Sequence, residues 1–166
     1  MKICGYVHKF DNNIDTDVII PARYCVTLDK KELARHCMND IKVEFFRHVK
    51  EGDIIVAGDN FGCGSSREVA PIAIQACGIR CIIAKSFARI FFRNSINIGL
   101  MAVVNNELYD LVSTGDYIEV DIENKFILSK SNNRKVEISM SNSTIIDEII
   151  GHNGLNNYIK SKNFRV

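Results

Sequence analysis

The chain has 166 residues, of which 46% are hydrophobic, and its 21 basic residues nearly balance its 20 acidic ones. We expect residues 1–166 to form a single domain in which residues 151–166 are a polar carboxy-terminal tail. No basic stripe indicates a nucleic-acid partner, and no apolar run approaches the ~20 residues of a membrane span. The amino terminus has no apolar signal-peptide segment, which predicts a cytoplasmic protein.

The first part of the chain alternates short apolar runs with helical patterns. The expected elements are a strand over 1–8, a loop-rich stretch over 9–29, a helix from Lys30 to Cys37 capped by Asp29, a helix from Val43 to Val49, a strand over 54–57, a helix over 65–77 ended by Gly78, a strand over 80–84, a helix from Ser86 to Asn97 closed by Gly99, and a strand over 101–104. Short apolar runs of this kind are typical of buried parallel strands.

The second part of the chain is richer in β-strands. The expected elements are a short helix over 106–113, strands Tyr117–Asp121, Phe126–Ser129 and Val136–Met140, a helix to Ile150 capped by Ser143 or Thr144, and a short helix in the tail. The sequence therefore predicts an α/β fold with a β-rich second half.

A glycine-rich loop over residues 58–68 carries the most informative chemistry. Its glycines permit close approach of the backbone to a ligand, and Gly64 stands next to Ser65, Ser66 and Arg67. We expect these side chains at the start of a helix, where free backbone N–H groups and the helix dipole attract an anion. A carboxylate fits this chemistry best.

An ordinary helix cap is the alternative interpretation of the same residues. Ser65 and Glu68 have the spacing of a capping box. Arg67 in the first turn opposes the helix dipole, however, and an anionic ligand would remove that conflict. The loop lacks the lysine of a phosphate-binding loop and has arginine where the dinucleotide fingerprint needs glycine.

Cysteine and histidine spacing predicts no metal site on this chain. The six cysteines form no C-x-x-C pair, and we expect Cys77 and Cys81 to be buried thiols. The four histidines show no ligand spacing such as H-x-x-x-H.

Four segments make the chain resemble a known family. Gly64–Glu68, Ala84–Phe91 and Asn97–Leu100 resemble the swivel domain of the aconitase superfamily, and Asp15–Pro21 resembles its stand-alone form, the small subunit of 3-isopropylmalate dehydratase. The resemblance covers residues 3–105 well, and it implies a swivelling β/β/α fold.

The resemblance implies a hydro-lyase subunit of leucine biosynthesis. Such an enzyme interconverts 2-isopropylmalate and 3-isopropylmalate, both dicarboxylates, by dehydration and rehydration. The small subunit works only with a large subunit, which carries a 4Fe–4S cluster, so we expect no cofactor on this chain. Two alternatives stay open: a related subunit acting on dimethylmalate, methylmalate or homoaconitate, and an anion-binding module without catalysis.

The resemblance also implies roles for single residues. Ser65 matches the catalytic base, acting as an alkoxide that the helix start, the Gly62–Gly64 amides and Arg67 would activate. Ser66 and Arg67 match contacts to the substrate carboxylate. Thr16 and Asp17 match the amino-terminal motif, in which the threonine binds substrate and the aspartate is catalytic.

Further assignments concern specificity and the amino-terminal motif. Val26 lies in a loop, Tyr24–Thr27, that matches the specificity loop of the family. Homoaconitase-like members carry arginine there, whereas valine suits an isopropyl group. Gly64 is assigned to substrate binding. For Asp17, an Asx turn before the apolar run is the structural alternative to a functional role.

Overall fold

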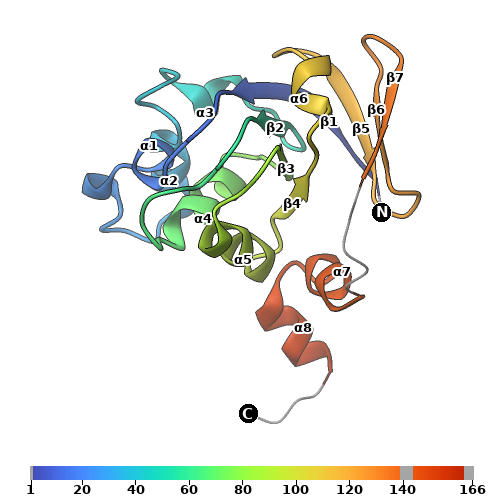
Figure 1. The fold of residues 1–166 in the computed structure, drawn as a ribbon. Helices are drawn as coiled ribbons and strands as arrows, with labels where there is room; N and C mark the ends of the chain where they lie inside the picture. The colour runs from blue at the N-terminus through green and yellow to red at the C-terminus, as the bar shows by residue number, and fades with distance from the viewer. Residues whose placement is uncertain (1, 139–143, 163–166) are drawn as a thin grey trace.

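The computed structural model describes residues 2–138 and 144–162. Its centre is a seven-stranded sheet of order β4-β3-β2-β1-β5-β6-β7 (Figure 1). The strands are β1 (Lys2–Phe10), β2 (Ile54–Ala57), β3 (Cys81–Ala84), β4 (Met101–Val104), β5 (Tyr117–Asp121), β6 (Phe126–Ser129) and β7 (Arg134–Glu137). The helices are α1 (Thr16–Ile19), the 3-10 turn η1 (Ala22–Tyr24), α2 (Lys30–His36), α3 (Phe45–His48), α4 (Val69–Ala76), α5 (Arg89–Asn97), α6 (Leu108–Leu111), α7 (Thr144–Gly151) and α8 (Leu155–Ser161).

The four strands β1 to β4 are parallel and buried at their centre. All four residues of β2 are buried, because the sheet is covered on both faces. Ile55 and Ala57 join a core under helices α1 to α5, whereas Ile54 and Val56 join a second core on the other face. The continuous apolar run of β2 follows from this double burial.

The antiparallel strands β5 to β7 close the second core. β5 pairs with β1, and β6 and β7 follow as a hairpin that turns out of the plane of the parallel strands (Figure 1). Val120, Ile127 and Val136 bury their side chains in this core. The result is a layer of helices, a parallel sheet and a curled antiparallel sheet, which confirms the predicted α/β fold with a β-rich second half.

Most predicted elements are present. The strand over 54–57 and the helix capped by Asp29 have the expected bounds to within one residue, and Gly78 ends α4 with a φ of +106°. The predicted polar tail contains α8. The expected cap Ser143 lies outside the described residues.

Several boundaries differ for local reasons. The stretch 9–29 is less loop-like than predicted, because β1 extends to Phe10 and Asp15 caps the short helix α1. Helix α3 is shorter than predicted, because Glu44 has a left-handed φ of 53° just before it. Strand β7 begins earlier than predicted, at Arg134, directly after Asn133 turns the chain with a φ of 54°.

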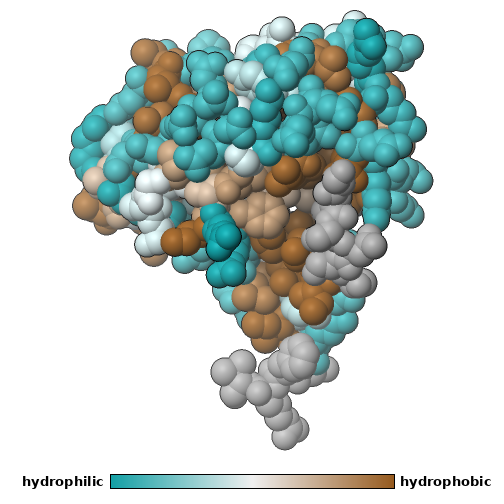
Figure 2. All heavy atoms as spheres, in the orientation of Figure 1, coloured by the Kyte–Doolittle hydropathy of each residue, from teal (hydrophilic) through white to brown (hydrophobic). Residues whose placement is uncertain are grey.

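Apolar side chains gather on the face where β4 meets α5 and α7 (Figure 2). Ile90 on α5 and Val104 on β4 are among the exposed apolar residues. None of the helices within the described ranges combines the length and the apolar character that crossing a membrane requires.

Candidate functional site

The amino-terminal motif lies against the glycine-rich loop. The Thr16 N–H donates to the Cys63 carbonyl at 2.8 Å, and the Gly62 N–H donates to the Ile14 carbonyl at 2.7 Å. Asp15 and Cys63 form an isolated parallel bridge. Two segments far apart in sequence are therefore joined by backbone hydrogen bonds, and they carry their side chains to one place.

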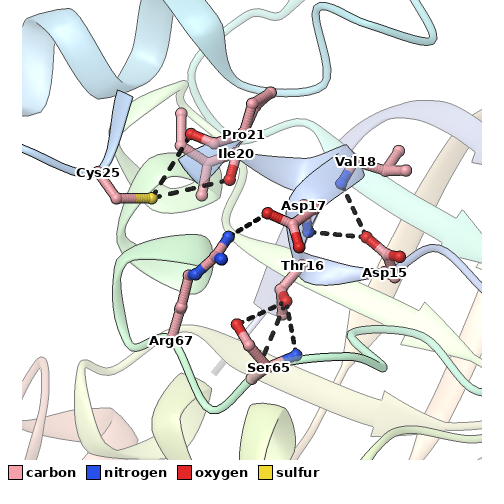
Figure 3. A network of polar contacts seen from close by, with 9 residues as sticks. All are labelled: Asp15, Thr16, Asp17, Val18, Ile20, Pro21, Cys25, Ser65 and Arg67. Atoms are coloured by element: carbon pink, nitrogen blue, oxygen red, sulfur yellow. Dashed lines mark hydrogen bonds and ion pairs between the residues drawn. The ribbon is translucent and has the colours of Figure 1, made fainter. Parts of the chain in front are cut away.

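The hydroxyl groups of Thr16 and Ser65 meet at this junction (Figure 3). Their oxygens lie 3.2 Å apart, and the Ser65 N–H donates to Thr16 Oγ1 at 3.1 Å. Thr16 is buried, with 1% of its surface exposed, whereas Ser65 is exposed. A buried hydroxyl therefore orients an exposed one.

Asp17 and Arg67 form an ion pair next to these hydroxyls (Figure 3). The guanidinium Nη1 donates to Asp17 Oδ1, and this hydrogen bond raises the pKa of Arg67 further above its ordinary value. Asp15, not Asp17, makes the Asx turn: its Oδ1 accepts from the Asp17 N–H at 2.7 Å and the Val18 N–H at 2.9 Å. The Asp17 carboxylate is turned to Arg67 instead.

The predicted start of the helix at residue 65 is wrong. Helix α4 begins at Val69, and its N-cap residue Glu68 makes no side-chain capping bond. The Ser65 N–H donates to Thr16 and the Gly62 N–H donates to Ile14, so neither is available as a helix-start donor. The capping box and the activation of Ser65 by the Gly62 amide are both overturned by these tertiary contacts.

Glycine is required at two positions of the loop. Gly62 has a φ of +77°, and a Cβ placed there would lie 2.1 Å from Cγ of Phe91. Gly64 has a φ of +95°, and a Cβ there would lie 3.2 Å from Thr16 Oγ1. Other residues rarely adopt such φ values, so the glycines let the loop turn close to α5 and to Thr16.

A polar network that sequence reasoning missed holds the beginning of the loop. Ser86 Oγ accepts from the Asn60 N–H at 2.8 Å and donates to Asp59 Oδ1 at 2.9 Å. On the other side, Asn12 Oδ1 accepts from the Asp59 N–H at 2.7 Å. The sequence predicts only a loop-rich stretch over 9–29 here, and no local pattern indicates that Asn12 is a partner of the glycine-rich loop.

Ser66 and Val26 are both exposed to solvent. The Ser66 carbonyl accepts from Asn94 Nδ2 at 3.4 Å, which ties the loop to α5. Val26 follows η1 and is 89% exposed. Its neighbour Cys25 is fixed by a long contact from Sγ to the Pro21 carbonyl at 3.6 Å. The structure thus brings Thr16, Ser65 and the ion pair together, and it exposes Val26 in the turn that follows η1.

The described residues do not fit an iron–sulfur cluster. Across residues 2–138 and 144–162, no three His, Cys, Asp or Glu side chains converge as metal ligands. Cys77 and Cys81 are buried, as predicted for structural thiols, and burial raises the pKa of Cys81 far above its ordinary value.

Comparison with known proteins shows the family of the chain. Residues 43–108 match the model of the aconitase C-terminal domain. The chain is 54% identical over 162 residues to a 3-isopropylmalate dehydratase small subunit of Helicobacter hepaticus, with 98% of each chain covered. It is 48% identical over 162 residues to a methanogen homoaconitase small subunit of Methanocaldococcus jannaschii, with 98% of this chain and 94% of that one covered.

A solved structure shows the same fold over nearly the whole chain. The crystal structure of a 3-isopropylmalate dehydratase from Methanocaldococcus jannaschii superposes with a TM-score of 0.92 at 48% identity. The match covers 98% of this chain and 95% of that chain. The chain therefore belongs to the 3-isopropylmalate dehydratase small-subunit family, which has the aconitase C-terminal swivel fold.

Proposed function

We propose that this chain supplies the proton-transfer side of a 3-isopropylmalate dehydratase. In this proposal it works with a large subunit that carries the 4Fe–4S cluster, and together they interconvert 2-isopropylmalate and 3-isopropylmalate in leucine biosynthesis. The single observation that carries the proposal is the hydroxyl pair of Thr16 and Ser65 beside the Asp17–Arg67 ion pair. Family membership supports it.

Ser65 is the proposed base. As an alkoxide, its Oγ takes a proton from a substrate carbon and becomes a hydroxyl, while the C–H electron pair becomes the double bond as the neighbouring hydroxyl leaves. An exposed serine is a weak acid, so the alkoxide needs a stabilising donor. The Thr16 hydroxyl, 3.2 Å from Ser65 Oγ, can donate to it. In the hydration step that completes the isomerisation, Ser65 gives its proton to the carbon that lost the hydroxyl, and the hydroxyl adds to the carbon that lost the proton.

Arg67 is the proposed carboxylate anchor, and Asp17 joins Ser65 in the catalytic group. A guanidinium presents several N–H donors in a planar fork that matches a carboxylate. Asp17 accepts from Nη1, which fixes the orientation of the fork and leaves its other donors for the substrate. Ser66 and the backbone at Gly64, both exposed, are proposed to complete the anion site. Thr16 orients Ser65 in this site through the contacts of its hydroxyl group with the Ser65 hydroxyl and N–H.

A second candidate function is that of a homoaconitase subunit. The homoaconitase relative is 48% identical to this chain, and the dehydratase relative is 54% identical. Because these identities are close, they do not decide between the two candidate functions. Val26 favours isopropylmalate, because an apolar side chain cannot pair with a second distal carboxylate. We therefore place isopropylmalate first.

The test is reconstitution with the matching large subunit under anaerobic conditions. We expect interconversion of the isopropylmalates only when both chains are present, and a loss of at least about 10³-fold in kcat for Ser65→Ala. Ser113→Ala, at an exposed serine of a distant turn, is the matched control and should leave kcat unchanged. Activity of this chain alone, or an active Ser65→Ala complex, would refute the proposal. Turnover of homoaconitate instead would select the second candidate.

A further inference from the structure

The glycine-rich loop begins where three parallel strands end together. β2 lies between β1 and β3, and the register of these strands ends at Phe10, Ala57 and Ala84. Beyond these ends the chains follow no regular ladder, so the backbone N–H groups of the loop need other acceptors. The residues that follow β1 and those that follow β3 supply them.

Two side chains accept consecutive N–H groups of the loop. Asn12 follows β1, and its Oδ1 accepts from the Asp59 N–H at 2.7 Å. Ser86 follows β3, and its Oγ accepts from the Asn60 N–H at 2.8 Å and donates to Asp59 Oδ1 at 2.9 Å. We call Asn12 and Ser86 the loop clamp. They hold adjacent residues of the loop from the two neighbouring chain segments.

The clamp fits the loop closely on the side of β1. A Cβ placed on Gly58 would lie 1.9 Å from Asn12 Oδ1, so any larger residue there would displace the Asn12 side chain. Asn60 and Asn13 both have a left-handed φ, of 58° and 55°, which asparagine adopts more readily than most residues. Asn60 Nδ2 donates to Asn13 Oδ1 at 3.0 Å. The loop and the segment after β1 are therefore shaped to each other.

The segment between the clamp and Ser65 has little freedom. Phe61 is fully buried, and its ring packs edge to face against Phe91 on α5. The Cys63 carbonyl accepts from the Thr16 N–H at 2.8 Å. A displacement at the clamp is therefore transmitted along the loop and moves the Ser65 hydroxyl relative to that of Thr16.

Water competes for the hydrogen bonds of the clamp. Asn12, Asp59 and Asn60 are exposed, and Ser86 is half-buried. A water molecule can satisfy an N–H that loses its protein acceptor, so removing a clamp side chain should cost little stability. Water does not tie the loop to the neighbouring segment, however. A positioning role therefore predicts a large effect on the site and a small effect on stability.

We propose that Asn12 and Ser86 are positioning residues of the dehydratase reaction, which hold the glycine-rich loop so that Ser65 Oγ stays beside the Thr16 hydroxyl. This inference rests on the proposed function, because that function makes Ser65 the base. A misplacement of a reacting group by about 1 Å can cost about 100-fold in rate. A loosened loop should therefore slow proton transfer.

Substrate binding should depend less on the clamp than turnover does. The proposed carboxylate anchor, Arg67, has its own partner in Asp17, which lies on α1 and not on the loop. Loss of a clamp side chain leaves this ion pair in place. We therefore expect kcat to fall more than KM rises.

The first test needs no partner subunit. NMR on the full chain follows the amide of Ser65, whose proton is donated to Thr16 Oγ1, with the amide of Ile127 on β6 as reference. Ser86→Ala and Asn12→Ala should each shift the Ser65 amide resonance and leave the reference unchanged. Ser86→Thr keeps the hydroxyl and should return the resonance towards its wild-type position. An unchanged Ser65 amide in both alanine variants would overturn the proposal.

The second test is kinetic and uses the reconstituted enzyme. Ser86→Ala and Asn12→Ala should each lower kcat about tenfold and change KM by less than about twofold. Ser86→Thr should recover most of the lost kcat. Wild-type kcat in both alanine variants would show that the clamp has no part in the reaction, even if the Ser65 amide shifts.

Matched controls come from the turn between β6 and β7. Ser131 Oγ accepts from the Tyr117 N–H at 3.1 Å, and Asn132 Oδ1 accepts from the Arg134 N–H at 3.0 Å. Ser131→Ala and Asn132→Ala thus remove the same kinds of acceptor far from the loop in the fold. They should lower the midpoint of urea denaturation about as much as the clamp variants do and keep the wild-type kcat. An equal loss of kcat in these controls would refute a specific role of the clamp.

Gly58→Ala tests the clamp with both of its side chains present. The added Cβ displaces Asn12, so this variant should lose kcat about as Asn12→Ala does. Because both changes break the same contact, the double variant should lose no more than either single variant. Losses that multiply would show that Gly58 acts independently of Asn12 and would contradict the proposed contact.

The two tests separate this inference from the proposed function. Failure of the proposed function is seen in the wild type, as a complex that does not interconvert the isopropylmalates. Failure of the inference is seen as variants that match an active wild type, or as an unmoved Ser65 amide. With an inactive wild-type complex, the positioning role in this reaction falls with the function, and the amide spectrum still decides whether the clamp sets the contact of Ser65 with Thr16.

Discussion

The hydroxyl oxygens of Thr16 and Ser65 lie 3.2 Å apart, although the two residues are 49 positions apart in the sequence. The contact joins a buried side chain to an exposed one, and the same Thr16 oxygen also accepts the Ser65 N–H. Thr16 therefore fixes both the backbone and the hydroxyl of the proposed base. This relationship makes Thr16 a positioning residue that can be tested separately from Ser65.

Replacing Thr16 by valine should lower kcat about 10- to 100-fold in the reconstituted enzyme, because the donor to the Ser65 oxygen is lost. KM should change little, since Arg67 is untouched. Thr16→Ser keeps the hydroxyl and should retain most of the activity. Steady-state kinetics check this, and a Thr16→Val enzyme with the wild-type kcat would remove Thr16 from the mechanism.

The two members of the Asp17–Arg67 ion pair are expected to affect different kinetic constants, Arg67 mainly KM and Asp17 mainly kcat. Arg67→Lys should raise KM about tenfold, because lysine keeps the charge but loses the fork that binds a carboxylate. Asp17→Asn keeps the shape but loses the charge, and it should lower kcat more than it raises KM. If Arg67→Lys leaves KM unchanged, the arginine is structural and serves only to pair with Asp17.

The close approach of Gly62 to Phe91 predicts a loss of stability. Gly62→Ala would place a Cβ 2.1 Å from the Phe91 ring at a φ of +77°, so both overpacking and backbone strain oppose folding. We expect a loss of about 2–4 kcal/mol in the free energy of unfolding by urea denaturation. Gly115→Ala, with a φ of +94° and no atom within 4 Å, carries the strain alone and should lose about 1–2 kcal/mol. Equal losses would show that the Phe91 contact is unimportant.

Local patterns predicted the buried strands well. The run 54–57 reads as a strand because both faces of β2 are covered, so that no polar residue interrupts it. The start of α4 was missed for the opposite reason: the Ser65 N–H is taken by Thr16, and no local pattern reports a partner so far away in the sequence.

Matching motifs predicted which residues form the candidate site, but they did not predict which of these residues pair with each other. The resemblance placed Thr16, Asp17, Ser65 and Arg67 in one site, and the structure brings these four together. That Asp17 pairs with Arg67, while the neighbouring Asp15 makes the Asx turn, depends on side-chain directions in α1. The sequence alone cannot distinguish the roles of the two aspartates in this D-x-D motif, because the helix determines the direction of each side chain.

Buried His8 predicts a pH dependence of stability. Burial lowers the pKa of His8 in the folded chain below 6.5, its ordinary value, which we take for the unfolded chain. Between the folded and the unfolded pKa, the unfolded chain therefore binds more protons than the folded chain. The free energy of unfolding should therefore decrease as the pH falls below 6.5, by at most about 1.4 kcal/mol per pH unit from this residue. Urea denaturation should show this slope in the wild type and a flatter slope in His8→Gln. Equal slopes would mean that His8 stays unperturbed or charged in the fold.

Exposed Val26 carries the substrate preference in the proposed function. Its side chain is 89% exposed, so an arginine fits there without disturbing the core of the chain. In the complex, Val26→Arg should lower kcat/KM for isopropylmalate about 10- to 100-fold, because the apolar contact is lost and a charge is left without a partner. Substrates with a second distal carboxylate should gain relative to isopropylmalate. Leu28→Arg, at a residue that is 77% exposed in the same segment, adds the same charge outside the matched position and should leave the ratio of the two kcat/KM values unchanged. An equal shift of the ratio in both variants would show a general effect of added charge. An unchanged ratio in both variants would show that the loop around Val26 does not contact the substrate side chain. The preference for isopropylmalate would then come from the partner subunit.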